Sequence, residues 1–127
     1  MKTTLWNATH NTLEVLNKIS DQKIPFLTSR HIFKAAEELT EEDRFLNVES
    51  EKIVNEYGAK PNENDQLVVY GENGEVDLEK TQEFIQKVIA LRETEMDFAI
   101  EPFNVEELAA VEISPKDYAA ISWLIDE

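Results

Sequence analysis

The first apolar pattern in the chain lies in residues 6–19, where hydrophobic side chains recur at helical spacing. This spacing predicts a short amphipathic helix with one buried stripe. The stripe consists of Thr9, Leu13, Leu16 and Ile19. Asn7 is of a residue type that favours a helix start. Pro25 separates this helix from the next one, because proline disfavours the α region for the residue before it.

A second and longer helix is predicted over residues 29–57. Its apolar positions alternate in steps of four and three, which is typical of a helix packed along another helix. They are Ile32, Ala36, Leu39, Leu46, Ile53 and Tyr57, with Asp43 and Ser50 as polar members of the same seam. Gly58 and Pro61 give a clear stop signal. Thr40, three residues before Asp43, is close to a capping box and leaves open a kink or a second helix start.

Residues 68–78, "VVYGENGEVDL", are the one stretch that predicts a β-hairpin. Asn73 and Gly74 are the preferred pair for a type I′ turn. Asp77 can then cap a further helix over residues 79–94. The predicted buried stripe of that helix is Thr81, Phe84, Ile85, Val88 and Leu91.

The segment "EMDFAIEPF" alternates between apolar and other residues, which predicts a half-buried strand over residues 96–101. A lone two-stranded hairpin is marginal in water, so we expect this strand to join the hairpin in a three-stranded sheet. The intervening helix favours a parallel position beside residues 75–78 as a right-handed crossover. An antiparallel position against residues 67–70 stays open.

Two start signals near the end of the chain predict short helices. Asn104 has Glu107 three residues later, and Ser114 is followed by Pro115. The expected fold is a single α+β domain over residues 1–127. It combines an N-terminal antiparallel helical hairpin with a long second helix, a small three-stranded sheet, a connecting helix and short C-terminal helices.

The charge of the chain is strongly acidic, with a net value of −15, and is unevenly spread. Residues 1–34 carry a net charge of +3, whereas residues 35–92 and 93–127 carry −9 each. Such a field repels phosphate backbones, so we expect no direct nucleic-acid binding. There is no apolar run approaching the roughly 18 residues that a membrane span needs. We therefore expect no membrane insertion, and a cytoplasmic location is the default expectation.

Residues that could carry chemistry are few. Cysteine is absent, which removes disulfides, thiolate zinc sites and thiol nucleophiles. The three glycines are explained by a helix stop and a turn, so no phosphate-binding loop can be built. His10 and His31 are the only imidazoles, and no metal-ligand spacing occurs. We therefore predict no catalytic residue, cofactor or metal site and no enzymatic activity, with a metal-dependent hydrolase as a distant third alternative.

Binding surfaces are better candidates. Trp123 points away from the apolar arc of the last helix, which leaves open either burial in the core or a role as an interface anchor. Trp6, at the front of the first helix, is a similar case. Asp43 is a polar seam residue, which is a device for setting register in self-association. Its acidic neighbours Glu41 and Glu42 complete the set of interface candidates.

Three stretches together resemble a known family. They are "LNKISDQKIPFLTSRHIFKAA" at 16–36, "IVNEYGAK" at 53–60 and "VEISPKDYAAI" at 111–121, with "ENGEVDL" between the last two. The chain resembles a family of short acidic proteins of unknown function from phages and prophages of low-GC Gram-positive bacteria. The resemblance covers about residues 16–122 and carries no catalytic residue across. It implies a phage or prophage origin and hence a bias towards protein–protein roles.

The function expected from these observations is that of a non-enzymatic phage-type accessory protein. It would bind a viral or host protein or assemble with itself, and association with the virion is left open. The alternative is a nucleic-acid mimic, in which carboxylates imitate phosphates to occupy a basic groove on a host defence or transcription enzyme. A mimic requires acidic side chains laid out along one face.

Overall fold

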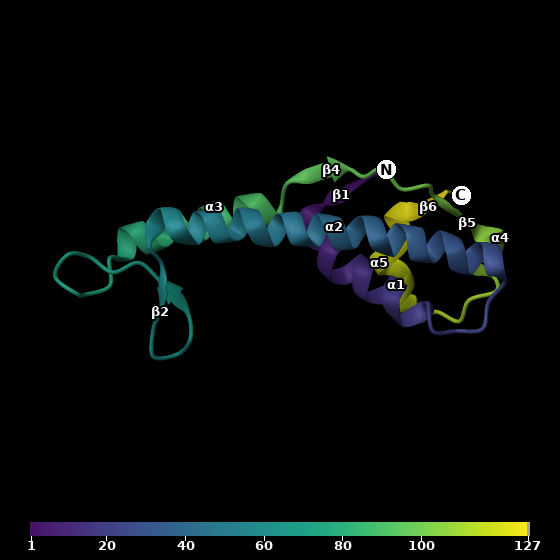
Figure 1. Ribbon diagram of the computed structural model, residues 1–127, viewed down its shortest axis with the longest axis horizontal. Helices are drawn as coiled ribbons and strands as arrows, with labels where there is room; N and C mark the ends of the chain where they lie inside the picture. The colour runs from purple at the N-terminus through teal and green to yellow at the C-terminus, as the bar shows by residue number, and fades with distance from the viewer. Residues whose placement is uncertain (127) are drawn as a thin grey trace. The chain divides into compact units, whose positions relative to one another are not determined.

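The computed structural model describes residues 1–126 and has the α+β fold that the sequence predicts, with one long helix and several short elements (Figure 1). The chain divides into two compact units. Unit 1 consists of residues 1–44 together with the segment from residue 95 onward, and unit 2 consists of residues 45–94. Helix α2 (Phe26–Tyr57) contributes its first part to unit 1 and its remainder to unit 2.

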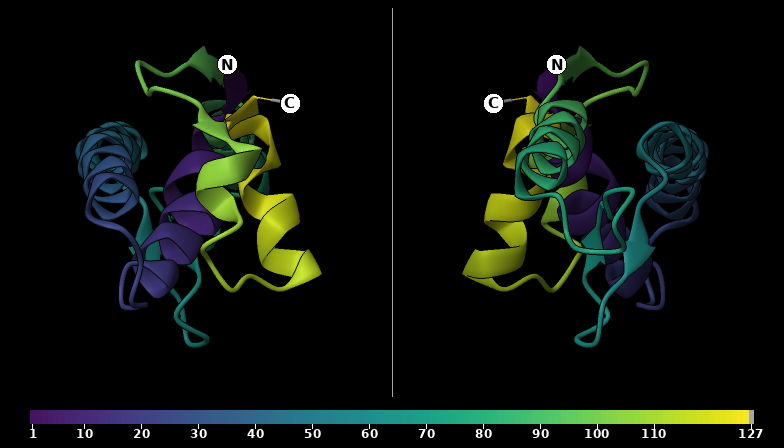
Figure 2. Two further views of the ribbon diagram at one scale, coloured as in Figure 1. Left: turned by 90° about the vertical axis from the view of Figure 1, so that its right-hand side faces the viewer. Right: turned by 90° about the vertical axis from the view of Figure 1, so that its left-hand side faces the viewer.

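Unit 1 is mainly helical. Its further elements are β1 (Lys2–Thr4), the π-helix η1 (Asn7–Thr12), α1 (Leu13–Ile19), β4 (Glu95–Asp97), β5 (Phe103–Asn104), α4 (Val105–Leu108), α5 (Pro115–Ile121), the 3-10 helix η2 (Ser122–Leu124) and β6 (Ile125–Asp126). Helix α5 lies beside η1 and α1, as the views of Figure 2 show in yellow and purple. Ser114 caps α5 as predicted, because its side chain accepts a hydrogen bond from Asp117 N.

The first helix buries the predicted stripe but starts differently. The helix begins at Leu5, and Thr4 Oγ1 accepts the hydrogen bond of Asn7 N at 3.1 Å. Asn7 is therefore not the cap: its side chain donates to Thr3 Oγ1 instead. All four residues of the predicted stripe are buried, namely Thr9, Leu13, Leu16 and Ile19.

Helix α2 packs on α1, which confirms the predicted helical hairpin with a long second helix. It begins at Phe26, directly after the proline, and continues through Thr40. Thr40 does not start a new helix, since its hydroxyl donates to the Ala36 carbonyl within the same helix at 2.7 Å. The buried stripe in unit 1 is Thr28, Ile32, Ala35 and Leu39, so Ala35 takes the place predicted for Ala36.

The end of α2 is the predicted one. Gly58 has a φ of +62°, and its N–H donates to Asn55 O at 3.3 Å. Ala59 N donates to Val54 O at 3.0 Å. These two hydrogen bonds are those of a Schellman motif, in which a left-handed residue after the helix satisfies its last carbonyls.

The predicted three-stranded sheet is wrong. The structure instead contains three two-stranded sheets within the described residues: β1 with β4 antiparallel, β2 (Lys60–Pro61) with β3 (Leu67–Val68) antiparallel, and β5 with β6 parallel. The strand expected over 96–101 is shorter, and Met96 pairs with Thr3 rather than with the hairpin. The physical reason is that β1 offers an extended segment for β4 to pair with inside unit 1, where Phe98 is buried.

Unit 2 contains two successive hairpins with the same kind of loop. In the second, residues 71–75, Gly74 N donates to Gly71 O at 3.0 Å, and Gly71 N donates to Glu75 O at 2.7 Å. Gly74 has a φ of +82°, whereas Asn73 keeps a negative φ. This is a three-residue loop with a left-handed third residue, not the predicted type I′ turn. Tyr70 therefore bridges to Val76, whereas the predicted turn would pair Gly71 with Val76.

The first hairpin repeats this geometry over residues 62–66. Asp65 N donates to Asn62 O at 3.1 Å, and Asn62 N donates to Gln66 O at 2.8 Å. Asp65 is the left-handed residue, with a φ of 58°. The two loops share Glu-Asn before the left-handed position, as "NENDQ" and "GENGE".

Helix α3 (Leu78–Arg92) closes unit 2 and starts at the predicted cap, since Asp77 Oδ1 accepts from Lys80 N at 3.0 Å. Thr81 fixes the hairpin to this helix: its Oγ1 accepts from Val69 N at 2.9 Å. The small core of unit 2 packs around Ala59, Val69 and Phe84. Of the predicted stripe of α3, Ile85 remains 42% exposed.

Candidate functional site

The first turns of α2 carry large apolar side chains that the fold does not bury. Phe26, Leu27 and Phe33 are 77%, 74% and 64% exposed. Phe26, Arg30 and Phe33 follow the helical spacing i, i+4, i+7, which places them on one side of the helix. That side is opposite the buried stripe that includes Ile32 and Leu39. We call Phe26, Leu27 and Phe33 the apolar face of α2.

Basic residues surround this face. Arg30 and Lys34 are exposed on the same two turns of α2, and Lys23 is exposed just before the helix. The face therefore combines aromatic and aliphatic side chains with positive charge, in a chain whose net charge is −15. Aromatic residues and arginine are the types enriched among side chains that anchor protein interfaces. Contiguous exposed apolar side chains of this kind are typical of a binding surface.

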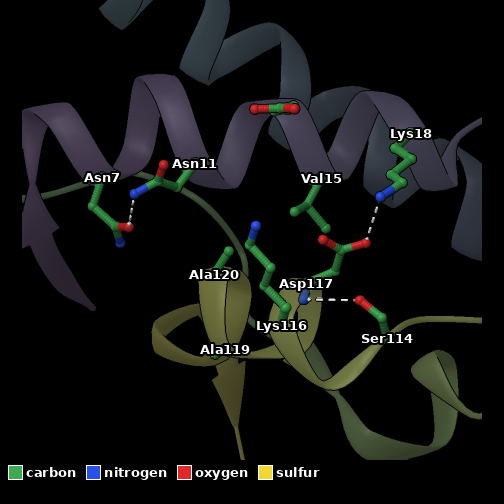
Figure 3. Close-up of a pocket in the computed structure, with 10 residues that line it drawn as sticks. Asn7, Asn11, Val15, Lys18, Ser114, Lys116, Asp117, Ala119 and Ala120 are labelled. Carbon is green, nitrogen blue, oxygen red and sulfur yellow. Dashed lines mark hydrogen bonds and ion pairs between the residues drawn. The ribbon is translucent and has the colours of Figure 1, made fainter.

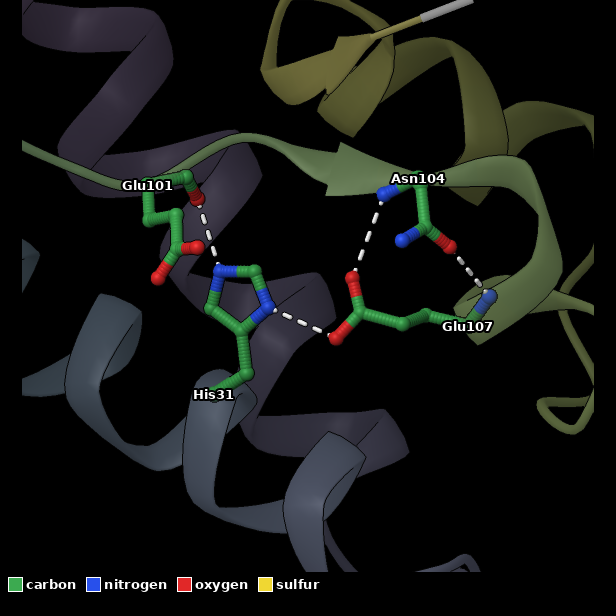
Figure 4. A network of polar contacts seen from close by, with 4 residues as sticks. All are labelled: His31, Glu101, Asn104 and Glu107. Atoms are coloured by element: carbon green, nitrogen blue, oxygen red, sulfur yellow. Dashed lines mark hydrogen bonds and ion pairs between the residues drawn. The ribbon is translucent and has the colours of Figure 1, made fainter.

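His31 anchors the same turns of α2 to the rest of unit 1 (Figure 4). Its Nδ1 lies 2.8 Å from Glu107 Oε1, and its Nε2 lies 2.7 Å from the carbonyl oxygen of Glu101. The imidazole also stacks on Phe103, with the ring centroids 4.0 Å apart. Phe103 is fully buried, so the histidine is held against the core of the unit.

Glu107 is in turn held by the capping box of α4. Asn104 Oδ1 accepts from Glu107 N at 2.7 Å, and Glu107 Oε2 accepts from Asn104 N at 3.1 Å. Both nitrogens of His31 thus lie within hydrogen-bond distance of oxygen atoms of the protein itself. The network acts as a structural clamp that fixes the backbone beneath the apolar face of α2.

A cleft of about 580 Å³ lies between the first helix and α5 (Figure 3). Lys18 Nζ and Asp117 Oδ2 form an ion pair of 2.9 Å across it. The hydrogen bond from Lys18 lowers the pKa of Asp117 below its ordinary value, and the same contact raises the pKa of Lys18. Asn11 donates to Asn7 on the same wall. These polar groups satisfy one another, and the cleft offers no activated nucleophile.

A smaller cleft of about 340 Å³ lies beside His31 and is lined mostly by residues of α2. Glu37, Glu38, Glu41 and Glu101 contribute carboxylates, and Lys34 contributes its amine. In the part of the chain that the structure describes, no three His, Asp or Glu side chains come together in a way that would hold a metal ion. Carboxylates thus predominate among the charged groups of this cleft.

The two tryptophans predicted as interface candidates lie in different environments. Trp123 is half-buried: its indole Nε1 donates to Thr12 Oγ1 at 2.8 Å, and its ring contacts Phe98 at a centroid distance of 5.5 Å. Trp6 is 37% exposed and stacks on His10 at a centroid distance of 3.5 Å. The contacts of Trp123 are those of a side chain that stabilises the fold.

The three acidic candidates lie together on α2. Glu41 is exposed and accepts a hydrogen bond from Arg44 at 2.7 Å. Glu42 and Asp43 are half-exposed. Partial burial and the nearby charge of Glu38 raise the pKa of Glu42. The structure therefore brings the acidic candidates together, but not with either tryptophan, because each tryptophan lies outside α2.

The apolar face of α2 is the feature that sequence reasoning missed. The helix was predicted over residues 29–57, so Phe26 and Leu27 fell outside it. Phe33 occupies none of the positions of the predicted helix–helix seam. This position outside the seam was the signal in the sequence for a second apolar side of the helix. An aromatic residue seven positions after Phe26, with Arg30 between them, indicates an apolar stripe separate from the buried one.

A scan against protein-family models, a search of curated proteins and a search of solved structures each returned no match. Within residues 1–126, none of the helices combines the length and the apolar character needed to cross a membrane. A function for this chain must therefore be inferred from its own surfaces and contacts.

Proposed function

We propose that this chain is a non-enzymatic accessory protein that works by binding another protein, viral or host, through the apolar face of α2. The single observation that carries the proposal is the exposure of Phe26, Leu27 and Phe33 on the first two turns of that helix. Keeping three large apolar side chains in water costs free energy that burial in a partner would recover, at roughly 25 cal/mol per Å² of apolar surface.

The charge around the face defines the partner. Lys23, Arg30 and Lys34 would meet acidic groups at the rim of the complementary surface, and charge complementarity favours encounter and specificity. A helix that presents residues at i, i+4 and i+7 suits an apolar groove. The partner is thus a protein with an apolar groove and an acidic rim.

The clamp at His31 supports this role. Because His31 and Glu107 hold the first turns of α2 against unit 1, the face is presented on a fixed helix. A surface that needs little ordering on binding loses less free energy to conformational entropy. The resemblance to short phage and prophage proteins expected from the sequence supports an accessory role, and we propose a partner from a phage or its bacterial host.

The test is a pull-down from phage-infected host lysate with the chain as bait. The variant Phe26→Ser with Phe33→Ser should fold as the wild type does, since both side chains are exposed, and should lose the captured protein. Val105→Ser is a matched control, because Val105 is a 55%-exposed apolar residue on α4. Capture that survives the double substitution, or that is lost equally in the control, would contradict the proposal.

A nucleic-acid mimic is the second candidate, and the crowding of carboxylates on α2 favours it. Glu38 and Glu42 are one helical turn apart, and their repulsion contributes to the raised pKa of Glu42. A basic groove on an enzyme would relieve this repulsion. Affinity for such an enzyme should fall steeply as salt concentration rises. Affinity that does not change with salt would rule the mimic out.

A further inference from the structure

The second hairpin of unit 2 carries an asparagine next to a glycine in an exposed loop. Asn73 is the one asparagine of the chain that a glycine follows, and both residues are exposed. The side-chain amide carbon of an asparagine, Cγ, is an electrophile that the backbone nitrogen of the next residue can attack to close a five-membered ring. Glycine has no Cβ to hinder this approach. A Cβ added at Gly74 would meet nothing within 4 Å beyond its chain neighbours, so the space around this residue is open.

A hydrogen bond holds the Asn73 side chain in the orientation that the attack requires. Its Oδ1 accepts from Glu75 N at 3.1 Å. An asparagine that bonds the N–H two residues later folds its side chain back over the intervening peptide group, which here is that of Gly74. Negative charge develops on Oδ1 when Cγ is attacked, and a backbone N–H already directed at that oxygen stabilises it. Holding both reacting groups in one short loop also lowers the entropic cost of their encounter.

We propose that Asn73 is a self-modification site, at which the Gly74 nitrogen attacks the side-chain amide with the help of the Glu75 N–H. The nitrogen forms a bond to Cγ, the bond from Cγ to the amide nitrogen breaks, and ammonia leaves with the proton of the Gly74 N–H. The hydrogen bond from Gly74 N to Gly71 O, of 3.0 Å, opens in this step. Water then opens the cyclic imide. Addition at Cγ gives aspartate, and addition at the backbone carbonyl gives isoaspartate, in which the chain continues through the side chain.

The first hairpin has the same loop geometry with a different residue after the asparagine. Asn64 occupies the position that corresponds to Asn73, and Asp65 follows it instead of a glycine. The side chain of Asp65 hinders the approach of its own backbone nitrogen to Cγ of Asn64. Asn64 should therefore stay intact under conditions in which Asn73 reacts.

The hydrogen bonds of the two loops differ as well. The N–H that corresponds to that of Glu75 belongs to Gln66, and it donates to Asn62 Oδ1 at 3.0 Å. In the second hairpin Gly71 stands at the position of Asn62 and has no side chain to compete for the N–H. A Cβ added at Gly71 would lie 3.2 Å from Oδ1 of Asn73. A side chain at position 71 would therefore displace the asparagine from its hydrogen bond.

Either product would alter the second hairpin. Aspartate adds a negative charge between Glu72 and Glu75, in a chain whose net charge is already −15. Isoaspartate adds one carbon to the backbone inside the loop that the hydrogen bond from Gly71 N to Glu75 O closes at 2.7 Å. We expect both products to lower Tm, with the larger decrease for isoaspartate. This inference is independent of the apolar face of α2, which lies in unit 1.

Incubation of the full chain in mildly alkaline buffer, followed by tandem mass spectrometry of its peptides, tests the proposal. Residue 73 should gain the mass difference between an amide and an acid, and chromatography should separate the aspartate and isoaspartate forms. Residue 64 should stay unchanged. An Asn73 that is still intact when other asparagines of the chain have reacted would overturn the proposal.

Gly71→Asn separates the geometry of the loop from its Asn-Gly sequence. This variant keeps Asn73 and Gly74 but supplies a side chain that competes for the Glu75 N–H, as Asn62 does in the first hairpin. The reaction at Asn73 should slow by about tenfold, the effect of losing one hydrogen bond to a developing charge. A rate equal to that of the wild type would contradict the role given to the Glu75 N–H.

Asp65→Gly is the matched test in the first hairpin. It places a glycine after Asn64 while Asn62 Oδ1 still accepts from Gln66 N. Asn64 should then react, but more slowly than Asn73 in the same molecule. Equal rates at the two asparagines would show that the sequence alone sets the reaction, and would overturn the proposal.

Discussion

The indole nitrogen of Trp123 donates a hydrogen bond to Thr12 Oγ1 at 2.8 Å, and Thr12 Oγ1 donates in turn to the Ala120 carbonyl at 2.7 Å. Thr12 is fully buried in η1, whereas Trp123 and Ala120 belong to the C-terminal helical turns. Residues more than a hundred positions apart are thus joined by one chain of hydrogen bonds. The hydroxyl of Thr12 thus links η1 to two positions of the C-terminal segment at once.

Truncation of Trp123 should therefore destabilise the fold. We expect Trp123→Ala to lower the free energy of unfolding by roughly 2–3 kcal/mol, because it removes a half-buried ring and leaves a cavity. Trp123→Phe keeps most of the ring and loses only the N–H, so it should cost about 1 kcal/mol. Urea denaturation measures both. Unchanged stability in Trp123→Ala, with loss of partner binding, would instead make Trp123 an interface anchor.

Thr81 should be the most sensitive polar residue of unit 2. Its hydroxyl accepts from Val69 N at 2.9 Å in a buried position. Thr81→Val keeps the shape and leaves the Val69 N–H without its acceptor, so we expect a loss of about 1–3 kcal/mol in the free energy of unfolding. Thr81→Ser restores the hydroxyl and should recover most of it. A loss in Thr81→Ser with none in Thr81→Val would show that the methyl group, not the hydrogen bond, matters here.

The left-handed residue is Gly74 in one hairpin loop of unit 2 and Asp65 in the other. We expect exchanging glycine and aspartate to affect stability differently at these two positions. Gly74→Asp puts a side chain at a φ of +82° and should cost about 1 kcal/mol, because L-residues are strained in the left-handed region. Asp65→Gly makes the opposite change at the equivalent position and should not destabilise the protein. Thermal denaturation monitored by circular dichroism compares the two. A neutral Gly74→Asp would mean that the second loop does not hold the observed geometry in solution.

The ion pair between Lys18 and Asp117 should give a pH-dependent contribution to stability. The pKa of Asp117 lies below its ordinary value of 3.8 in the folded state. The ionised carboxylate therefore stabilises the fold at pH values above 3.8, and this contribution is lost as the pH falls through the lower folded value. Asp117→Asn should lower Tm at pH 7 and have progressively less effect below pH 3.8.

Lys18→Met removes the same ion pair from the other side. The double variant should be about as stable at pH 7 as the less stable of the two single variants, since each substitution alone already breaks the contact. A Tm difference between wild type and Asp117→Asn that persists unchanged at low pH would contradict the assigned role of the carboxylate.

The parts of the fold that the sequence predicts correctly are those with local causes. The caps at Asp77, Asn104 and Ser114 and the left-handed Gly58 each depend on residues within one or two turns. The signal for each of them is therefore complete in a short segment. The same holds for the stripe of the first helix, whose buried residues recur within a single element.

The predicted three-stranded sheet was wrong because strand pairing depends on residues far apart in the sequence. Met96 pairs with Thr3, a choice that alternation within residues 96–101 does not encode, because any extended segment can supply the partner strand. The turn of the second hairpin was wrong for a different reason: Asn-Gly is compatible with more than one loop length, and the structure uses the longer loop.

In the candidate site, too, the features that depend on contacts distant in the sequence were not predicted. The exposure of Phe26 and Phe33 depends on which side of α2 meets the core, and that side is set by packing. The sequence predicted an amphipathic helix but not the additional apolar face. Trp123 was left between two roles because the position of its indole depends on Thr12, far away in the sequence.

The most direct test of the central claim is calorimetric titration of the chain with the partner protein recovered in the pull-down. The wild type should bind with a negative heat-capacity change, as burial of apolar surface requires, and Phe26→Ser with Phe33→Ser should bind about a hundredfold more weakly or not at all. Equal affinity of the wild type and the double variant would contradict the claim that the apolar face of α2 is the binding surface.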